Sequence, residues 1–259
     1  MKPIVSVIIT TFNRPQYLAE AIESILTQDF KDLELIVVND ASTDEKTEQI
    51  ILSCKDRDQR IKYIKNERNL NSVRSLNAGL KSASGKYIAI LDDDDVWICK
   101  EKLLQQVKFL EENNEYVLAG TNIIAVNSET GREIARSKYA LTDEKIRKTI
   151  LGNNPFAHSS VVYRKDAVLS LGGYDENLKR GKDYDLWLRL GKLGKMAVLP
   201  EFWVKYRINT SSRKNAIKVK RNDSRVKLTI MKKHSSNYPN FLFPYIVEWI
   251  RYLIFSAIA

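Results

Sequence analysis

The sequence contains few of the residues that would indicate a secreted, disulfide-bonded protein. Among its 259 residues there are two cysteines, Cys54 and Cys99, and they do not have the spacing of a metal site. So small a number predicts a reducing compartment. No secretory signal precedes the first apolar segment, which follows Pro3, and we therefore expect a cytoplasmic protein.

Glycine is absent from the turn after the first predicted strand, which reads TTFNRP. A backbone without glycine at this position cannot approach a pyrophosphate as a G-x-G-x-x-G turn does, which excludes a dinucleotide-binding domain. Nucleotidyltransferases place a glycine-rich, basic loop at the same point, so this activity is a weaker alternative. Internal repeats and low-complexity tracts are also absent from the sequence.

Positive charge is concentrated in one late segment. The net charge is +10, and residues 205–233 contain eleven lysines and arginines against the single acid Asp223. The rest of the chain is balanced, with thirty-one basic and thirty-one acidic residues. Because no nucleic-acid-binding motif accompanies the basic run, nucleic acid is not an expected partner.

The first ninety residues alternate between strand and helix patterns. This alternation predicts an α/β fold with a Rossmann-like, mostly parallel central sheet flanked by helices. Such sheets bind ligands beyond the carboxyl ends of their strands, where Thr10, Asp40 and the run Asp92 to Asp95 fall. We expect strands over 5–10, 33–40, 61–64 and 87–91. Helices are expected over 15–28 and 72–83, and a third helix between them is expected to begin after a cap at Ser42 or Thr43.

The second half of the chain has the pattern of antiparallel structure. A hairpin turn is expected at 128–131, between a strand and its return. The remaining expected elements are helices over 100–113, 142–151 and from Asp183, and strands over 117–126, 159–163, MAVLP and FWVKYR.

The segment KYIAILDDDDVW, residues 86–97, is the centre of the expected site. Five consecutive apolar residues predict a strand that is buried on both faces, and four carboxylates follow it at once. Such a cluster of like charges is costly unless a cation lies among them, and Mg²⁺ or Mn²⁺ prefers carboxylate oxygen. We therefore expect a divalent metal here. The alternative is a solvated acidic turn that caps the next helix.

Four segments, in this order and spacing, resemble the family-2 glycosyltransferases with a GT-A fold. They are VSVIITTFNRPQYLAEAIESIL, LIVVNDASTD, SGKYIAILDDDDVW and KDYDLWLRL, and the resemblance covers about residues 4–208. It implies a metal-dependent, inverting transfer of a hexosyl or N-acetylhexosaminyl group from a nucleotide-diphosphate sugar, with UDP as the expected nucleotide, to a saccharide or lipid-linked saccharide. Surface polysaccharide synthesis is the expected setting. A non-catalytic nucleotide-sugar-binding or scaffold subunit is the alternative.

The resemblance also implies roles for residues of the donor site. Thr10 and Phe12 are expected near the nucleobase, and Asp40 is expected to accept its hydrogen bonds unless it is only a helix cap. Asp94 is the expected metal contact, and Asp92 or Asp93 is expected to serve the ribose and the donor sugar.

By the same resemblance, Asp183 matches the general base that takes the proton of the acceptor hydroxyl, and a helix N-cap is the alternative. The residue before it is Lys182, where the family frequently has glutamate. The family also often has an arginine where this chain has Leu76. Arg74 is therefore a weak candidate for contact with the diphosphate, against a plain surface arginine.

Three further residues have two interpretations each. His158 is expected either to contact the acceptor or diphosphate or to form a local hydrogen bond. Trp187 is expected either to stack on the acceptor sugar or to belong to the core. Arg207 is expected either to reach the diphosphate or to lie at a solvated strand end.

The chain is expected to consist of a catalytic domain, residues 1–208, and a helical tail, residues 209–259. The catalytic domain has a nucleotide-binding half, 1–98, and an acceptor half, 99–208. Residues 209–215 resemble a lid that orders over bound nucleotide. The basic run and the apolar end of the tail favour a helix in the interface of an anionic membrane, on its inner face. Packing on the catalytic domain, a homodimer contact and a membrane span are the alternatives.

Overall fold

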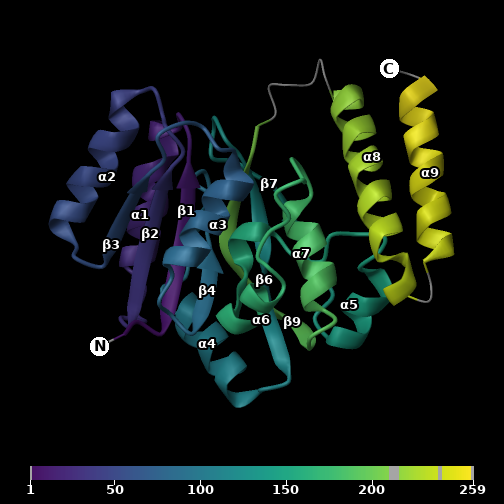
Figure 1. Cartoon of the computed structure of the whole chain (residues 1–259), viewed down its shortest axis with the longest axis horizontal. Helices are drawn as coiled ribbons and strands as arrows, with labels where there is room; N and C mark the ends of the chain where they lie inside the picture. The colour runs from purple at the N-terminus through teal and green to yellow at the C-terminus, as the bar shows by residue number, and fades with distance from the viewer. Residues whose placement is uncertain (1, 210–215, 239–240, 258–259) are drawn as a thin grey trace.

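A computed structural model of the chain describes residues 2–209, 216–238 and 241–257 (Figure 1). Except for Asn209, the segment predicted to be a lid lies outside the described residues.

The first half of the chain forms the parallel part of one sheet, as its alternating pattern predicts. β1 pairs with β2 on one side and with β4 on the other, β2 pairs with β3, and all three pairs are parallel. The elements of this half are β1 (Val5–Thr11), α1 (Pro15–Leu26), β2 (Leu33–Asn39), α2 (Glu45–Arg57), β3 (Ile61–Lys65), α3 (Ser72–Ser82) and β4 (Tyr87–Ile90).

The second half continues the same sheet with mixed strand directions. The strand order is β3-β2-β1-β4-β8-β6-β9-β5, and β7 also pairs with β6. β8 is antiparallel to β4 and β6, whereas β6 and β9 are parallel. The elements of this half are β5 (Val96–Trp97), α4 (Lys102–Glu112), β6 (Tyr116–Asn127), β7 (Glu133–Ser137), α5 (Asp143–Thr149), the 3₁₀ helix η1 (His158–Ser160), β8 (Val162–Arg164), α6 (Lys165–Ser170), α7 (Lys182–Leu190) and β9 (Lys195–Ile208).

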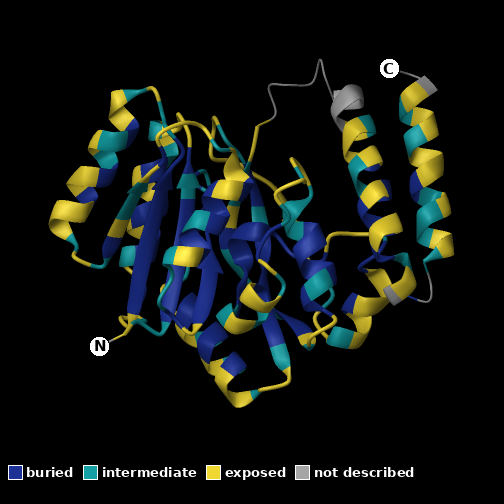
Figure 2. Ribbon diagram, viewed as in Figure 1, coloured by how far each residue is buried: buried dark blue, intermediate teal, exposed yellow. Residues whose placement is uncertain are grey.

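Helices cover both faces of the sheet and divide the core in two. Successive residues of a strand point to opposite faces, so Val7 and Ile9 pack with Leu18 of α1, whereas Ile8 packs with Leu76 of α3. Helices α1, α2 and α4 contribute to the first cluster, and α3, α5 and α7 contribute to the second. Figure 2 shows the central strands buried between these layers. The predicted α/β fold class is confirmed.

Two strands differ from the prediction. MAVLP and FWVKYR form the single strand β9, because a shift in its register with β6 accommodates Pro200 without ending the pairing. The strand predicted from residue 159 begins only at Val162, because His158–Ser160 form a 3₁₀ turn before it.

Two helix starts also differ. The side chain of Asp44 caps α2, and Ser42 and Thr43 lie too early to do so. The N-cap position of α7 is Gly181, whose φ of 68° lies in the left-handed region. The alternative role of Asp183 as the N-cap of this helix is therefore wrong.

The C-terminal residues form a helical hairpin at the opposite end of the molecule from α2 (Figure 1). It consists of α8 (Ala216–His234), the 3₁₀ helix η3 (Ser235–Asn237) and α9 (Leu242–Ala257). Ile230 and Met231 attach α8 to the core, and α9 lies beside α8. Of the helices in the described ranges, none is long and apolar enough to cross a membrane. The division into two parts after residue 208 stays a prediction, although β9 ends at Ile208.

Candidate active site

A cavity of about 460 Å³ opens where β1, β2 and β4 end. The structure brings together in it six of the predicted site residues, which are Thr10, Phe12, Asp40, Asp92, Asp93 and Asp94. The rest of its lining is Thr11, Arg14, Asn69, Asn71, Ser72, Lys182 and Tyr206. Because the carboxyl ends of parallel strands share one edge of the sheet, residues far apart in the sequence meet there.

Three loops near this edge contain residues with an unusual backbone. Asn13 (φ 53°), Ala41 (φ 60°) and Asn71 (φ 76°) are the non-glycine residues with positive φ in the described chain. Such conformations cost about 1 kcal/mol or more each and persist where the surroundings enforce them. The amide oxygen of Asn13 accepts a 2.8 Å hydrogen bond from the backbone N–H of Thr43, which ties the loops after β1 and β2 together. The loops around the cavity are thus held in a fixed shape.

Asp40 is buried at the end of β2 and is held by two donors. Its Oδ1 accepts hydrogen bonds from Asn66 Nδ2, at 2.7 Å, and from the backbone N–H of Leu70, at 2.8 Å. Asn66 is itself fixed by a 2.9 Å hydrogen bond to Ser75 Oγ. Because Asp44 caps α2, the capping alternative does not apply to Asp40. Its carboxylate is an immobile acceptor in the wall of the cavity.

Asp92 and Asp95 are tied to η1. Asp92 Oδ1 lies 2.9 Å from His158 Nδ1, and His158 Nε2 lies 2.8 Å from Tyr174 Oη. Asp95 Oδ2 accepts a 2.5 Å hydrogen bond from Ser159 Oγ. Burial tends to raise the pKa of Asp92, but the contact with His158 outweighs it and lowers this pKa to about 2. Asp92 is therefore ionised at neutral pH.

Asp93 and Asp94 share one cation. Arg14 Nη1 lies 3.1 Å from Asp93 Oδ1 and 2.7 Å from Asp94 Oδ2. Burial nevertheless raises the pKa of Asp93 to about 6, and burial together with the charge of Asp92 raises the pKa of Asp94. One half-exposed guanidinium does not neutralise the loop. The remaining negative charge of the loop faces the cavity and favours a further cation.

The acidic loop, residues 92–95, offers carboxylate oxygens to a divalent metal. Asp92 and Asp94 expose 33% and 28% of their side chains at the cavity. Across residues 2–209, 216–238 and 241–257, no three His, Cys, Asp or Glu side chains are grouped to hold a metal by themselves. Mg²⁺ usually takes one or two carboxylates and completes its coordination with water and substrate phosphates. The loop therefore fits a metal that shares its coordination with a phosphate ligand.

Asp183 lies in the first turn of α7, next to the lining residue Lys182, but is not itself part of the cavity lining. Its Oδ2 accepts a 2.7 Å hydrogen bond from Asn154 Nδ2. The neighbouring Lys182 lines the cavity and donates to Ser72 Oγ, at 2.9 Å. Burial and the charges of nearby carboxylates, Asp183 among them, raise the pKa of Tyr206, a lining residue. The charge of the Asp183 carboxylate thus acts on Tyr206 in the wall of the cavity.

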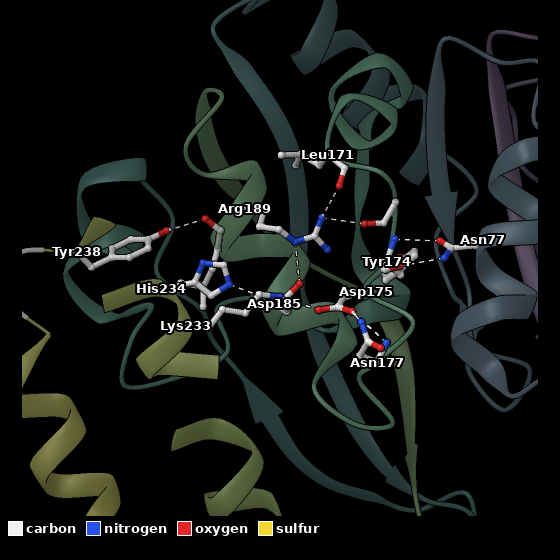
Figure 3. A network of polar contacts seen from close by, with 12 residues as sticks. Asn77, Leu171, Tyr174, Asp175, Asn177, Asp185, Arg189, Lys233, His234 and Tyr238 are labelled. Atoms are coloured by element: carbon white, nitrogen blue, oxygen red, sulfur yellow. Dashed lines mark hydrogen bonds and ion pairs between the residues drawn. The ribbon is translucent and has the colours of Figure 1, made fainter. Parts of the chain in front are cut away.

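Asp185, two residues further along α7, has a different environment (Figure 3). Its side chain is wholly buried, with Oδ2 at 2.7 Å from Arg189 Nε and Oδ1 at 2.9 Å from both Lys233 Nζ and His234 Nε2. Hydrogen bonds from these three residues outweigh burial and lower the pKa of Asp185. Because Lys233 and His234 belong to α8, Asp185 holds the hairpin against α7.

Arg74 and Trp187 lie away from the cavity. Arg74 is exposed and pairs with Glu176, at 3.2 Å between Nε and Oε2. Trp187 is wholly buried and packs against Phe156 and Tyr163. Stacking of Trp187 on an acceptor sugar is therefore corrected to a role in the core, since none of its ring reaches the surface.

His158 and Arg207 contact the acidic loop, residues 92–95, without lining the cavity. The His158 side chain is 7% exposed and is occupied by Asp92 and Tyr174. The backbone N–H of Arg207 donates to Asp95 Oδ1, at 2.8 Å, and its Nη1 donates to the carbonyl oxygen of Asp94, at 2.7 Å. His158 thus forms the local hydrogen bonds of its second interpretation, neither residue lines the cavity, and both hold the loop in shape.

Arg14 was not predicted as a site residue. It follows β1 in the turn TTFNRP, just before Pro15 at the start of α1. Its position at the carboxyl end of a strand was the available signal, because that is the edge where Asp40 and Asp94 also lie.

Comparisons with known proteins identify a family for the chain. The profile described as Glycosyl transferase family 2 matches residues 6–172. The chain is 39% identical over 211 residues to the uncharacterized glycosyltransferase MJ1057 of Methanocaldococcus jannaschii, a match that covers 80% of this chain and 71% of that protein. It is 32% identical over 205 residues to the amylovoran biosynthesis glycosyltransferase AmsE of Erwinia amylovora, covering 78% and 75%.

Two solved structures share the fold. One is S. aureus TarS 1–349 in complex with UDP-GlcNAc, with a TM-score of 0.71 and 22% identity over 97% of this chain and 71% of that one. The other is the mannosyltransferase PcManGT from Pyrobaculum calidifontis in complex with GDP-Man and Mn²⁺, with a TM-score of 0.73 and 15% identity over 99% and 74%. At these identities the similarity concerns the fold.

Proposed function

This chain belongs to glycosyl transferase family 2, and we propose that it is an inverting enzyme that transfers a hexosyl or N-acetylhexosaminyl group from a UDP-sugar. The acceptor in this proposal is a saccharide or a lipid-linked saccharide. The observation that carries it is the cavity in which Asp40, the acidic loop and two cationic side chains, Arg14 and Lys182, meet. A nucleotide-diphosphate sugar needs each of these: an acceptor for a base N–H, and charge that matches a metal-bound diphosphate.

The nucleobase end of the proposed donor site is formed by Asp40, Thr10 and Phe12. Asp40 is fixed by two donors and is ready to accept an N–H of the base. Phe12 is 42% exposed and offers a ring face. The complex of TarS with UDP-GlcNAc supports uridine, and the complex of PcManGT with GDP-Man makes guanosine the competing result of a donor screen.

At the diphosphate end we assign Asp94 to contact Mg²⁺ or Mn²⁺, and Asp92 or Asp93 to serve the ribose and donor sugar. The Mn²⁺ of PcManGT supports a divalent metal. When bound, such an ion supplies positive charge to a departing diphosphate. Lys182 and Arg14 line the same cavity and add positive charge from the protein.

Asp183 is the proposed general base. The acceptor hydroxyl gives its proton to the Asp183 carboxylate as its oxygen attacks the anomeric carbon. The bond from that carbon to the diphosphate oxygen breaks in the same displacement, the diphosphate leaves with the electron pair, and the configuration inverts. The hydrogen bond from Asn154 to Asp183 Oδ2 orients the carboxylate for this task.

Surface polysaccharide synthesis is the proposed setting, supported by the naming of AmsE for amylovoran biosynthesis. The alternative is a subunit that binds nucleotide sugar without transferring it. Only turnover distinguishes the two, because both need the same cavity.

A donor screen tests the proposal. Purified protein is incubated with a panel of UDP- and GDP-sugars in Mn²⁺, Mg²⁺ or EDTA, with and without a membrane lipid extract. Nucleotide binding and nucleotide release are measured for each donor. We expect metal-dependent release of UDP from one donor. Binding without turnover of any donor, even with the extract, would favour the scaffold alternative, and no binding of any nucleotide would contradict the proposal.

A further inference from the structure

The outer side of α9 is apolar over its whole described length. Seven large apolar side chains recur at positions three and four apart, and each is exposed by 43–77%. Residues at this spacing lie on one side of a helix. They form the α9 apolar face, which consists of Leu242, Phe243, Ile246, Trp249, Ile250, Leu253 and Ile254. Figure 2 shows the exposed residues along α9.

Of the two charged residues of α9, Glu248 lies against α8, and Arg251 is half-exposed. Glu248 is buried, with Oε2 at 3.0 Å from Lys227 Nζ of α8 and at 3.4 Å from Arg251 Nη1. This is the reverse of an ordinary amphipathic helix on a core, which buries its apolar side. Contiguous apolar surface of this kind on a soluble chain marks an interaction site.

Helix α8 carries unpaired positive charge next to α9. Lys220, Arg221, Arg225 and Lys232 form no ion pair with an acid in the described part of the chain. Lys220 Nζ lies 5.9 Å from the ring centroid of Phe255, so α9 and this unpaired charge are adjacent. Residues 216–257 as a whole contain eight lysines and arginines against two acids.

We propose that the α9 apolar face docks on an anionic membrane and lies in its interface. Apolar and aromatic side chains enter the boundary between headgroups and acyl chains, and unpaired lysines and arginines of α8 meet anionic headgroups. Phe243 and Trp249 suit this boundary, where aromatic rings are enriched. The face covers residues 242–254, about 18 Å of helix, which lies flat on the bilayer and is too short to cross it.

Charge favours the membrane over a second copy of the chain. A symmetric dimer would place the same surface on both sides of the contact, and so would bring two hairpins, each with a net charge of +6, together. An anionic bilayer is complementary to that charge. The inference does not depend on the proposed transferase activity, because docking is measured without donor or acceptor.

Vesicle sedimentation with the full chain tests docking. Vesicles of phosphatidylcholine, with or without phosphatidylglycerol, are spun down with the wild type and with Ile246→Glu/Ile250→Glu. We expect the wild type to pellet with the anionic vesicles, and the double variant to bind about tenfold more weakly. Leu104→Glu on α4 is the matched control, because Leu104 is 42% exposed on the other side of the sheet, and it should pellet like the wild type.

Two further measurements separate insertion from adhesion of charge. Emission of Trp249 should shift to the blue on anionic vesicles, and Trp249→Phe should lose the shift while it still pellets. Arg221→Gln/Arg225→Gln, which leaves the apolar face intact, should weaken binding to anionic vesicles only.

Three results would overturn the proposal. The first is a wild type that does not pellet with anionic vesicles. The second is equal pelleting of the wild type and the Ile246→Glu/Ile250→Glu variant. The third is a concentration-dependent dimer in analytical ultracentrifugation that this variant dissociates, because a second copy would then cover the face.

Discussion

Two carboxylate sites in this protein are built in opposite ways. In the loop after β4, Asp93 and Asp94 share one half-exposed arginine, Arg14. In α7, the single carboxylate of Asp185 contacts three basic side chains, one from α7 and two from α8. In the loop one basic side chain contacts two acids, whereas in α7 and α8 three basic side chains contact one acid.

The pKa values of the two groups differ accordingly. Burial raises the pKa of Asp93 to about 6, whereas hydrogen bonds from basic neighbours overcome burial and lower the pKa of Asp185. A buried acid whose charge is fully matched by the protein holds the fold together. Acids whose charge is unmatched at a cavity indicate that a ligand completes them.

The largest expected effect is on activity, from Asp94→Asn. If Asp94 contacts the metal and diphosphate, its loss should lower the rate of sugar transfer by about a hundred- to a thousandfold. Stability should not fall, because one of several repelling carboxylates is removed. Rates and thermal midpoints of the variant and of Asp166→Asn, an exposed acid in the first turn of α6, measure this. A rate close to that of the wild type would show that Asp94 has no such role.

For Asp185→Asn the main expected effect is on stability and not on activity. The substitution leaves the buried His234 and the nearly buried Arg189 without their acid, and Lys233 keeps only Asp175, so it should lower the free energy of unfolding by about 3 kcal/mol. Asp223→Asn is the matched control on α8. It removes an exposed pair with Arg180, for which we expect less than about 1 kcal/mol. Urea unfolding of both variants gives the comparison, and equal losses would mean that burial of Asp185 adds nothing.

The smallest expected effect is the pH dependence of Asp93→Asn. Because the pKa of Asp93 is higher in the folded than in the unfolded chain, its ionisation costs stability as the pH rises from about 4 to about 6. The variant lacks this cost. Relative to the wild type, it should therefore gain about 2 kcal/mol of unfolding free energy between those pH values. Urea unfolding at several pH values measures the difference, and a difference independent of pH would refute it.

Apolar runs and strand ends were enough to predict which residues of the first half meet at the cavity. The unbroken runs in β1, β2 and β4 indicate buried parallel strands, and the carboxyl ends of such strands meet at one edge. Thr10, Asp40 and Asp94 could therefore be expected together. Arg14 could be expected at the same edge, but its pairing with the acidic loop is a contact across about eighty residues that no local pattern encodes.

The environment of α7 was less predictable because this helix is covered on two sides. Core residues of the sheet bury Trp187 from one direction, and α8 buries Asp185 from the other. A pattern of spacing along α7 alone cannot distinguish Asp183, which follows the cavity-lining Lys182, from Asp185, two residues later. The distinction comes from Lys233 and His234, which lie about fifty residues further along the chain.

Asp183→Asn tests the central claim most directly. Binding of UDP by calorimetry and the turnover number with a competent donor and acceptor are measured for the variant and the wild type. The account predicts UDP affinity within about twofold of the wild type and a kcat lower by about a thousandfold, since a general base acts on the acceptor proton and not on donor binding. A variant that binds UDP and turns over at the wild-type rate would contradict it.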